Sequence, residues 1–507
     1  MAPSSETASE KNLEETNVNI VASESPGDDF DYNYTPEQVD AYQLDPAVAR
    51  QVTRAMDLRI MPLCFCMYLF SALDRGNISN AKTDGLNKDL HLIGNQYNMI
   101  LTAISVTFAT CAVAGGYITR RFGPKRVLPL YMMGWGTMAM INAAVKNFGG
   151  AVAVRFFLGM FEGFFGPSVT IYLTSFYTRG ELAKRMAIYY SSSAFSGAFS
   201  GLLAYGIFQA NTRLHGWQIL FLIEGGLTLF VAFIAMFFLP GYPRYCKFLT
   251  HEQKEAATMR LLKDASKRVN APFNGKEFLM PLRQKKLYVF AAYALCYGTA
   301  SSTATTFLAQ IIGRWKFSTV KTNLYTVGPN LVGMAWLLAN CYASDYLRQR
   351  SWFLVGAAAT TMVGSIILVA LPITSLGPGY FACYLISMGA FIPTCLFHSW
   401  HNNNDPSEMG RAFRTFSSGF LTFCANAGSL ISSNIFLDSD APKYTHALIA
   451  SACLQVLAII ILLAVRTYMV LDNRKRNKEQ GVNWTTVDVP TADLVEGPAN
   501  PKFRHFL

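Results

Sequence analysis

The chain has 507 residues, of which 51% are hydrophobic and only 15% are charged, and its mean hydropathy is +0.24. Because a soluble globular protein carries about 25% charged residues, this composition excludes a soluble enzyme or binding protein. The net charge of +11 lies largely in short basic loops between long apolar runs, which indicates membrane topology and argues against nucleic-acid binding. We therefore predict an all-α membrane protein that crosses the bilayer many times.

Residues 1–57 are polar and acidic. They contain neither the basic segment nor the apolar segment of a cleavable signal peptide. Because they have too few apolar residues to form a core, we predict a disordered, cytosolic N-terminal tail. Membrane insertion must then rely on the first spanning helix.

Twelve apolar segments follow, each long enough to cross a bilayer as a helix, which takes about 20 residues. They lie near residues 58–78, 97–119, 127–146, 150–178, 186–208, 217–239, 287–310, 323–343, 352–373, 378–398, 411–436 and 445–469. A basic, part-helical loop over 240–286 separates the sixth segment from the seventh. We therefore predict two six-helix halves, over 58–239 and 287–470, and a cytosolic C-terminal tail over 471–507.

Basic residues mark the cytosolic side of a membrane protein. The loops "RRFGPKR", "RGELAKR" and "DYLRQR" and the later "NRKRNK" all fall on one side if both termini are cytosolic. Two of these loops occupy matching places in the two halves, and we expect their charges to form a cytosolic collar whose salt bridges hold the outward-open state. The collar residues are Arg120, Arg121, Lys125, Arg126, Asp345, Arg348 and Arg350.

Four motifs occur in a characteristic order. They are "LDRGNISNAKTDGLNKDLHLIGNQYN" (73–98), "RFFLGMFEGFFGPSVTIYLTSFYTRGELAKRMAIYY" (155–190), "GWQILFLIEGG" (216–226) and "LPGYP" (239–243). In these motifs the chain resembles the major facilitator superfamily and, within it, the fungal anion:cation symporters, which include allantoate, nicotinate, pantothenate and biotin permeases. The resemblance covers about residues 58–470 and implies a twelve-helix transporter for a small organic anion that uses no cofactor.

Two charged residues, Arg155 and Glu162, lie inside the fourth predicted span. A charge at the bilayer centre costs several kcal/mol, so such residues are functional candidates by default. Seven residues apart, they share one helix face with Gly159 and Gly163, and Gly166 borders it; small residues there let a neighbouring helix approach closely. Our hypothesis is that Arg155 attracts an anionic substrate and Glu162 exchanges protons. The alternative is that both residues hold the first half together.

Three further charges lie at or within the spans of the first half. Asp74 and Arg75 are near the outer end of the first span, and a pair between Asp74 and Arg155 would be either a gate or a permanent clamp. Glu224 lies in the sixth span. Because a buried carboxylate can titrate near neutral pH, Glu162 and Glu224 are the candidates for proton coupling.

The second half offers aromatic and amide side chains instead of buried charges. Tyr293, Tyr297, Asn330 and Asn426 are candidates for hydrogen bonding to a substrate, and hydrogen bonding between helices is the alternative. His398 and His401 are expected at a solvated end of the tenth span, without the third ligand that a metal site needs.

These features predict a proton-coupled importer of a small carboxylate-bearing solute, acting as a monomer in the plasma membrane. An exporter of a fungal secondary metabolite is the first alternative, and a nutrient receptor that does not transport is the second. The sequence has no phosphate loop, no GxSxG nucleophile motif and no pair of histidines inside a span, which argues against an enzyme.

Overall fold

The computed structural model describes residues 42–43, 45–209, 213–264, 280–404, 410–486, 488–489 and 500–507. Most of the predicted N-terminal tail lies outside these residues. The first spanning helix, α3 (Pro46–Thr83), begins well before the predicted residue 58. Its start is explained locally, because the Asp45 side chain accepts a hydrogen bond of 2.7 Å from the Ala47 N–H and proline suits the first helical position.

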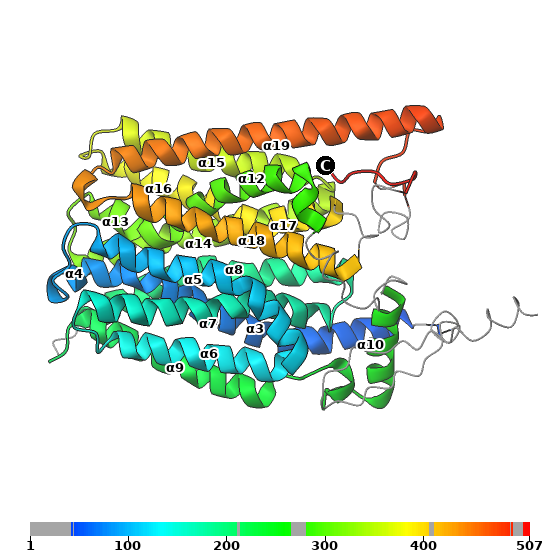
Figure 1. The fold of residues 1–507 in the computed structure, drawn as a ribbon, viewed down its shortest axis with the longest axis horizontal. Helices are drawn as coiled ribbons and strands as arrows, with labels where there is room; N and C mark the ends of the chain where they lie inside the picture. Colours follow the sequence, from blue (N-terminus) through cyan, green and yellow to red (C-terminus); the bar gives the residue numbers. More distant parts are fainter. Residues whose placement is uncertain are drawn as a thin grey trace, which may run out of the picture.

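The helices of the described residues follow the twelve predicted spans (Figure 1). The first half contains α3, α5 (Gln96–Phe122), α6 (Pro124–Asn142), α7 (Phe148–Thr174), α8 (Arg179–Ile207) and α9 (Gly216–Phe238), with a short α4 (Leu86–Asp89) between the first two. The second half contains α12 (Lys285–Ser302), α13 (Leu308–Gly313), α14 (Thr319–Leu347), α15 (Ser351–Ala370), α16 (Leu376–Ala390), α17 (Ile392–Asn404), α18 (Gly410–Ile435) and α19 (Thr445–Gln480). Six helical stretches are long and apolar enough to span a membrane by length and composition alone.

Two spans of the second half are interrupted. The seventh consists of α12 and α13 joined by a π-helical turn, η3 (Thr303–Phe307). The tenth is divided at Phe391 into α16 and α17. Such interruptions in a spanning helix are tolerated where protein surrounds the backbone, and Phe391 is buried. Phe391 has φ and ψ of −88° and −25°, so the tenth span bends at this residue while its backbone stays close to helical.

The two halves pack side by side, with α8 of the first half against α14 of the second, α5 against α18, and α3 against η3 and α13 (Figure 1). One end of the molecule carries the start of α3, the loop helix α10 (His251–Asp264) and the C-terminal segment. We call it the tail end. The opposite end, with α4 and α13, is the far end. Hydrophobic residues fill the interior of each half.

The loop helix α10 is fixed to the tail end of the first half. Arg260 Nη1 lies 3.0 Å from Glu181 Oε1, and Arg260 Nη2 donates to the carbonyl of Phe176 at 2.8 Å. Nearby, the Arg185 guanidinium binds both carboxylate oxygens of Asp57, at 2.9 and 2.5 Å. The part of the predicted central loop that the structure describes is therefore docked, and it is helical as predicted.

Glycines bring α5 and α7 into close contact, as predicted for the fourth span. A Cβ atom at Gly163 would lie 2.5 Å from the carbonyl oxygen of Phe108, and one at Gly159 would lie 2.5 Å from that of Ile104. Gly166 differs, because a Cβ atom there would meet nothing within 4 Å.

Gly163→Ala is therefore expected to lower the free energy of unfolding by about 1–3 kcal/mol, the usual cost of overpacking. Gly166→Ala on the same helix is the matched control and should be neutral or slightly stabilising, since alanine favours a helix over glycine. Thermal unfolding of the two purified variants measures the difference. Equal melting temperatures would contradict the close packing of α5 against α7.

The hydrogen bonds that join the two halves within the described part of the chain lie at the far end. Asn98 Nδ2 donates to the carbonyl of Phe436 at 3.3 Å. Thr319 Oγ1 donates to the carbonyl of Thr83 at 3.0 Å, and Asn323 Nδ2 donates to Thr83 Oγ1 at 3.1 Å. The structure thus represents a state in which the halves meet at the far end.

Candidate functional site

Arg155 is buried between α3, α7 and α9 and is 1% exposed. Its Nη1 donates to the main-chain carbonyl of Asp74 at 3.1 Å, and its guanidinium lies 5.3 Å from the centre of the Phe221 ring. Arg155 and Asp74 are therefore neighbours, but the contact is to the main-chain carbonyl and not the charge pair between side chains that the sequence suggested. Nε and Nη2 of Arg155 have no hydrogen-bond partner among the described residues. This position suits a buried charge that links helices. It suits a substrate-binding residue less well.

Arg75 is the cation of this cluster that is open to its surroundings, with 28% of its side chain exposed. Its Nε lies 3.5 Å from Glu162 Oε2, and its guanidinium stacks 4.7 Å from the Phe108 ring centre. The next residue, Gly76, faces the other half, because a Cβ atom there would lie 3.7 Å from the Thr305 carbonyl. Arg75 thus lies on α3, a helix of the first half that also contacts η3 and α13 of the second.

Three carboxylates surround the two arginines. Asp74 Oδ2 accepts a hydrogen bond of 3.3 Å from Thr228 on α9. Glu162 on α7 and Glu224 on α9 are fully buried, and within the described residues their carboxylate oxygens receive no hydrogen bond. The charges of all three acids act on Arg155. A buried carboxylate without donors is costly when ionised, so the cluster contains groups able to take up a proton.

A row of tyrosines continues from Arg75 toward the second half. Tyr68 on α3 lies 6.0 Å from the Arg75 guanidinium, stacks on Tyr189 at 4.3 Å and meets Tyr190 at 5.7 Å. Tyr190 on α8 packs against both large hydrophobic clusters of the interior. The row therefore extends from the charged cluster to α8, the helix of the first half that packs against α14 of the second.

Two histidines of α17 are not at a solvated helix end, so that prediction was wrong. His398 Nε2 lies 3.1 Å from the Tyr297 hydroxyl, and His401, 2% exposed, has its Nε2 3.0 Å from Ser417 Oγ. His398, Tyr68 and Tyr190 were missed as site residues. The available signal was a set of polar aromatic side chains inside apolar runs, which by itself is weak.

The other candidates of the second half have separate positions. Tyr293 is buried on α12 with its ring 4.9 Å from that of Phe397. Asn330 lies against Gly197 of α8, where a Cβ atom would come within 2.7 Å of its amide, so it belongs to the contact between the halves. Asn426 Nδ2 donates to the Thr422 carbonyl of its own helix at 2.8 Å. Tyr297 is the member of this set whose hydroxyl contacts His398.

The collar residues lie at the tail end. Arg350 Nη2 is 3.5 Å from Asp345 Oδ1 in the same half, while Arg121, Lys125 and Arg126 are exposed. Arg348 caps α14 with a positive φ of 50°, and the Arg120 side chain lies outside the described part. In this state the structure therefore shows one collar pair, formed within the second half.

Comparison with known proteins places this chain among transporters. The sequence model described as Major Facilitator Superfamily matches residues 64–433. The chain is 45% identical over 458 residues to the "MFS-type transporter efuF" of Hormonema carpetanum, covering 90% of this chain and 92% of that protein. It is 29% identical over 461 residues to the "High-affinity nicotinic acid transporter" of Saccharomyces cerevisiae, covering 90% and 84%.

A solved structure shares the architecture. The proton:xylose symporter XylE, bound to a bromo-deoxyglucose, superposes with a TM-score of 0.65 at 13% sequence identity, covering 81% of this chain and 96% of that one. At this identity the likeness concerns the arrangement of the helices.

Proposed function

Because this chain belongs to the major facilitator superfamily, and is therefore a membrane transporter and not an enzyme, we propose that it imports a small organic anion together with protons. The observation that carries this proposal is the ion pair between Arg75 and Glu162. It places a partly exposed arginine side chain, bordered by Tyr68, beside a fully buried carboxylate. A guanidinium is well suited to bind a carboxylate. The substrate-binding role assigned to Arg155 from the sequence fits Arg75 better.

The pair couples proton binding to anion binding. While Glu162 is ionised it neutralises Arg75, and the two charges satisfy each other. When Glu162 takes up a proton, Arg75 is left as an unpaired cation in a poorly solvated site, where an anion binds favourably. Binding one ion therefore favours binding the other, as reciprocity between linked sites requires. Glu224 and Asp74, deeper in the first half, are further proton carriers in this scheme.

The aromatic row supplies the rest of the binding site. Tyr68, Tyr190 and Tyr297 come from both halves, so a solute held among them contacts both. His398 adds a hydrogen-bonding group through its contact with Tyr297. An aromatic carboxylate fits such a lining, because flat rings stack on tyrosines. The nicotinic acid transporter among the relatives supports the choice of a pyridine carboxylate as the first probe.

The basic loops support an orientation with the tail end in the cytosol. With the halves joined at the far end, this structure would then be an inward-facing state. The collar residues would pair across the halves only after the tail end closes, in the outward-facing state. A plasma-membrane location follows from the proposed role in uptake.

The test is a panel of labelled carboxylates, led by nicotinate, offered to cells that lack their own uptake and express this chain. We expect uptake of at least one anion, stimulation at low external pH and loss with an uncoupler. Arg155→Ala is the control for loss of a buried structural charge. We expect it to lower the amount of folded protein as well as uptake. Secretion of a solute without uptake of any carboxylate would refute the import proposal.

A further inference from the structure

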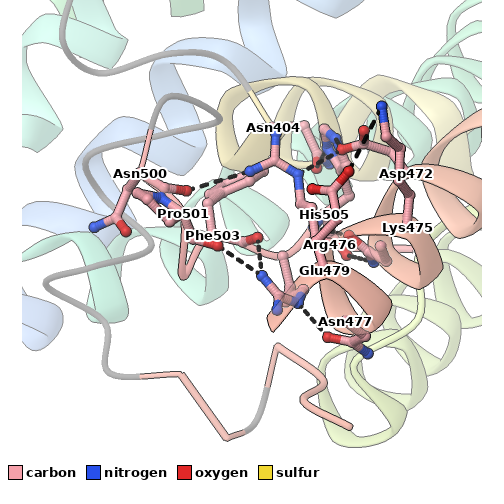
Figure 2. Close-up of polar contacts among 12 residues, drawn as sticks. Asn404, Asp472, Lys475, Arg476, Asn477, Glu479, Asn500, Pro501, Phe503 and His505 are labelled. Atoms are coloured by element: carbon pink, nitrogen blue, oxygen red, sulfur yellow. Dashed lines mark hydrogen bonds and ion pairs between the residues drawn. The ribbon is translucent and has the colours of Figure 1, made fainter. Parts of the chain in front are cut away.

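The last eight residues, Asn500–Leu507, pack against the tail end of the second half (Figure 2). Phe503 and Arg504 are 0% exposed and His505 is 5% exposed. Chain ends are usually poorly ordered unless something ties them down. Helix α19 supplies part of the docking surface, because it continues to Gln480, beyond the span predicted to end near 469.

Two asparagines bind the main chain of this segment. Asn404, at the end of α17, accepts from the Phe506 N–H at 3.0 Å and donates to the Phe506 carbonyl at 3.0 Å. Asn473 on α19 likewise accepts from the His505 N–H at 2.8 Å and donates to the His505 carbonyl at 3.1 Å. The N–H of Arg350 donates to the carbonyl of Leu507 at 2.6 Å. Three consecutive residues are thus held by their peptide groups.

The side chain of Arg504 adds sequence specificity. Its Nε donates to Asn477 Oδ1 at 2.7 Å and its Nη2 donates to Gln480 Oε1 at 2.8 Å. Its guanidinium also lies 5.7 Å from the ring centre of Trp484. A residue without this planar set of donors could not make the same contacts.

His505 makes a second specific contact. Its Nε2 lies 3.1 Å from Asp472 Oδ2, and its Nδ1 lies 3.2 Å from Asn404 Oδ1. Partial burial acts to raise the pKa of Asp472, but hydrogen bonds from Arg476 and His505 outweigh it and hold that pKa below its ordinary value. Asp472 therefore stays ionised and gives His505 a charged partner.

The segment is connected to the candidate transport site through α17. Trp400 Nε1 and Asn404 Nδ2 both donate to the Phe506 carbonyl, at 2.8 and 3.0 Å. The same 13-residue helix carries His398, which contacts Tyr297. At its other end α17 is separated from α16 at Phe391. The C-terminal segment therefore holds the end of a helix whose opposite end is the bend at Phe391.

We propose that Asn500–Leu507 is an intramolecular peptide ligand and that the tail end of α17 and α19 is its binding site. Docking of this peptide fixes the direction of α17 and so keeps His398 against Tyr297. Release of the peptide frees α17 to move about the bend at Phe391. The C-terminus is thereby a regulatory element of the transport site, and this inference does not depend on which solute is carried.

The experiment compares the full chain with a variant that ends at residue 499, using hydrogen exchange of α17 and binding of the synthetic peptide NPKFRHFL. We expect α17 to exchange about tenfold faster in the shortened protein, the factor expected from losing one or two hydrogen bonds. The peptide should bind the shortened protein saturably, restore slow exchange, and fail to bind the full chain, whose site is occupied. A peptide with alanine at the positions of Arg504 and His505 should not bind.

Full-length point variants keep the test valid if the shortened protein fails to fold. Asn473→Ala should raise the exchange rate of α17, whereas Lys475→Ala on the same helix, whose ion pair is to Glu479, should leave it unchanged. Unchanged exchange of α17 in both Asn473→Ala and the shortened protein would overturn the proposal. Equal binding of the peptide to the full and shortened chains would do the same.

Discussion

Replacing Arg75 by alanine is expected to lower kcat/KM for uptake of the transported carboxylate by about 10- to 150-fold. That factor corresponds to losing a hydrogen bond to a charged group, which contributes about 1.5–3 kcal/mol. The reason is structural: Arg75 is the partly exposed cation of the cluster and borders both Glu162 and the tyrosine row. Uptake of labelled solute over a range of concentrations measures the loss.

Two control variants make the Arg75 result specific. Arg75→Lys keeps the charge but not the planar donor pair, and should retain part of the activity. Arg50→Ala removes an exposed cation at the start of α3, outside the collar, and should leave kcat/KM unchanged. Wild-type uptake by Arg75→Ala, with equal amounts of each protein in the membrane, would show that this arginine does not meet the substrate.

Glu162→Gln is expected to remove the pH dependence of the KM for the anion. In the native protein KM should fall as external pH falls, because protonation of Glu162 releases Arg75 from its ion pair. Glutamine imitates the protonated acid, so the variant should bind the anion at high pH as well as at low pH. It should also lose accumulation driven by a proton gradient, since it has no proton to bind and release at this position.

Glu224→Gln separates the two acids proposed for proton coupling. The charge of Glu224 interacts with those of Arg155 and Asp74. In this scheme it affects the substrate site only through them. We expect this variant to change the rate of transport while KM still responds to pH. If Glu224→Gln abolished the pH response of KM and Glu162→Gln preserved it, the proposed coupling through Arg75 would be wrong.

The fold was largely predictable from the sequence because long apolar segments recur between short polar loops. The start of the first helix was missed because Arg50, Arg54 and Asp57 interrupt the apolar residues that follow Pro46, and the helix begins there because of its Asp45 cap. The interruptions at η3 and Phe391 were also missed, although Thr303, Thr305 and Thr306 in η3 and Pro393 just after Phe391 are local departures from an apolar helix.

The sequence predicted which residues form the charged cluster, but not how they are arranged. Every charge inside a span is costly, so Arg155, Glu162 and Glu224 were conspicuous. Which arginine is accessible depends on how α3 and α7 face the second half, and this is decided by packing that no short-range pattern encodes. The sequence therefore pointed to Arg155 as the substrate contact, whereas Arg75 is the more exposed of the two.

The environment of the α17 histidines was not predictable for a related reason. The residues after His401 are polar, which is typical of a solvated helix end. In the structure the C-terminal segment covers this end, through hydrogen bonds between Asn404 and Phe506. Residues about a hundred positions apart make this contact, and nothing in the local sequence at either end indicates the other.

The central claim is that a carboxylate and a proton cross the membrane together through the site formed by Arg75 and Glu162. The most direct test is the purified protein in liposomes that enclose a pH-sensitive dye, with nicotinate or another anion from the uptake panel added outside. We expect the lumen to acidify as the anion enters. With Arg75→Ala we expect neither entry of the anion nor acidification. Entry of the anion without any movement of protons would contradict the account.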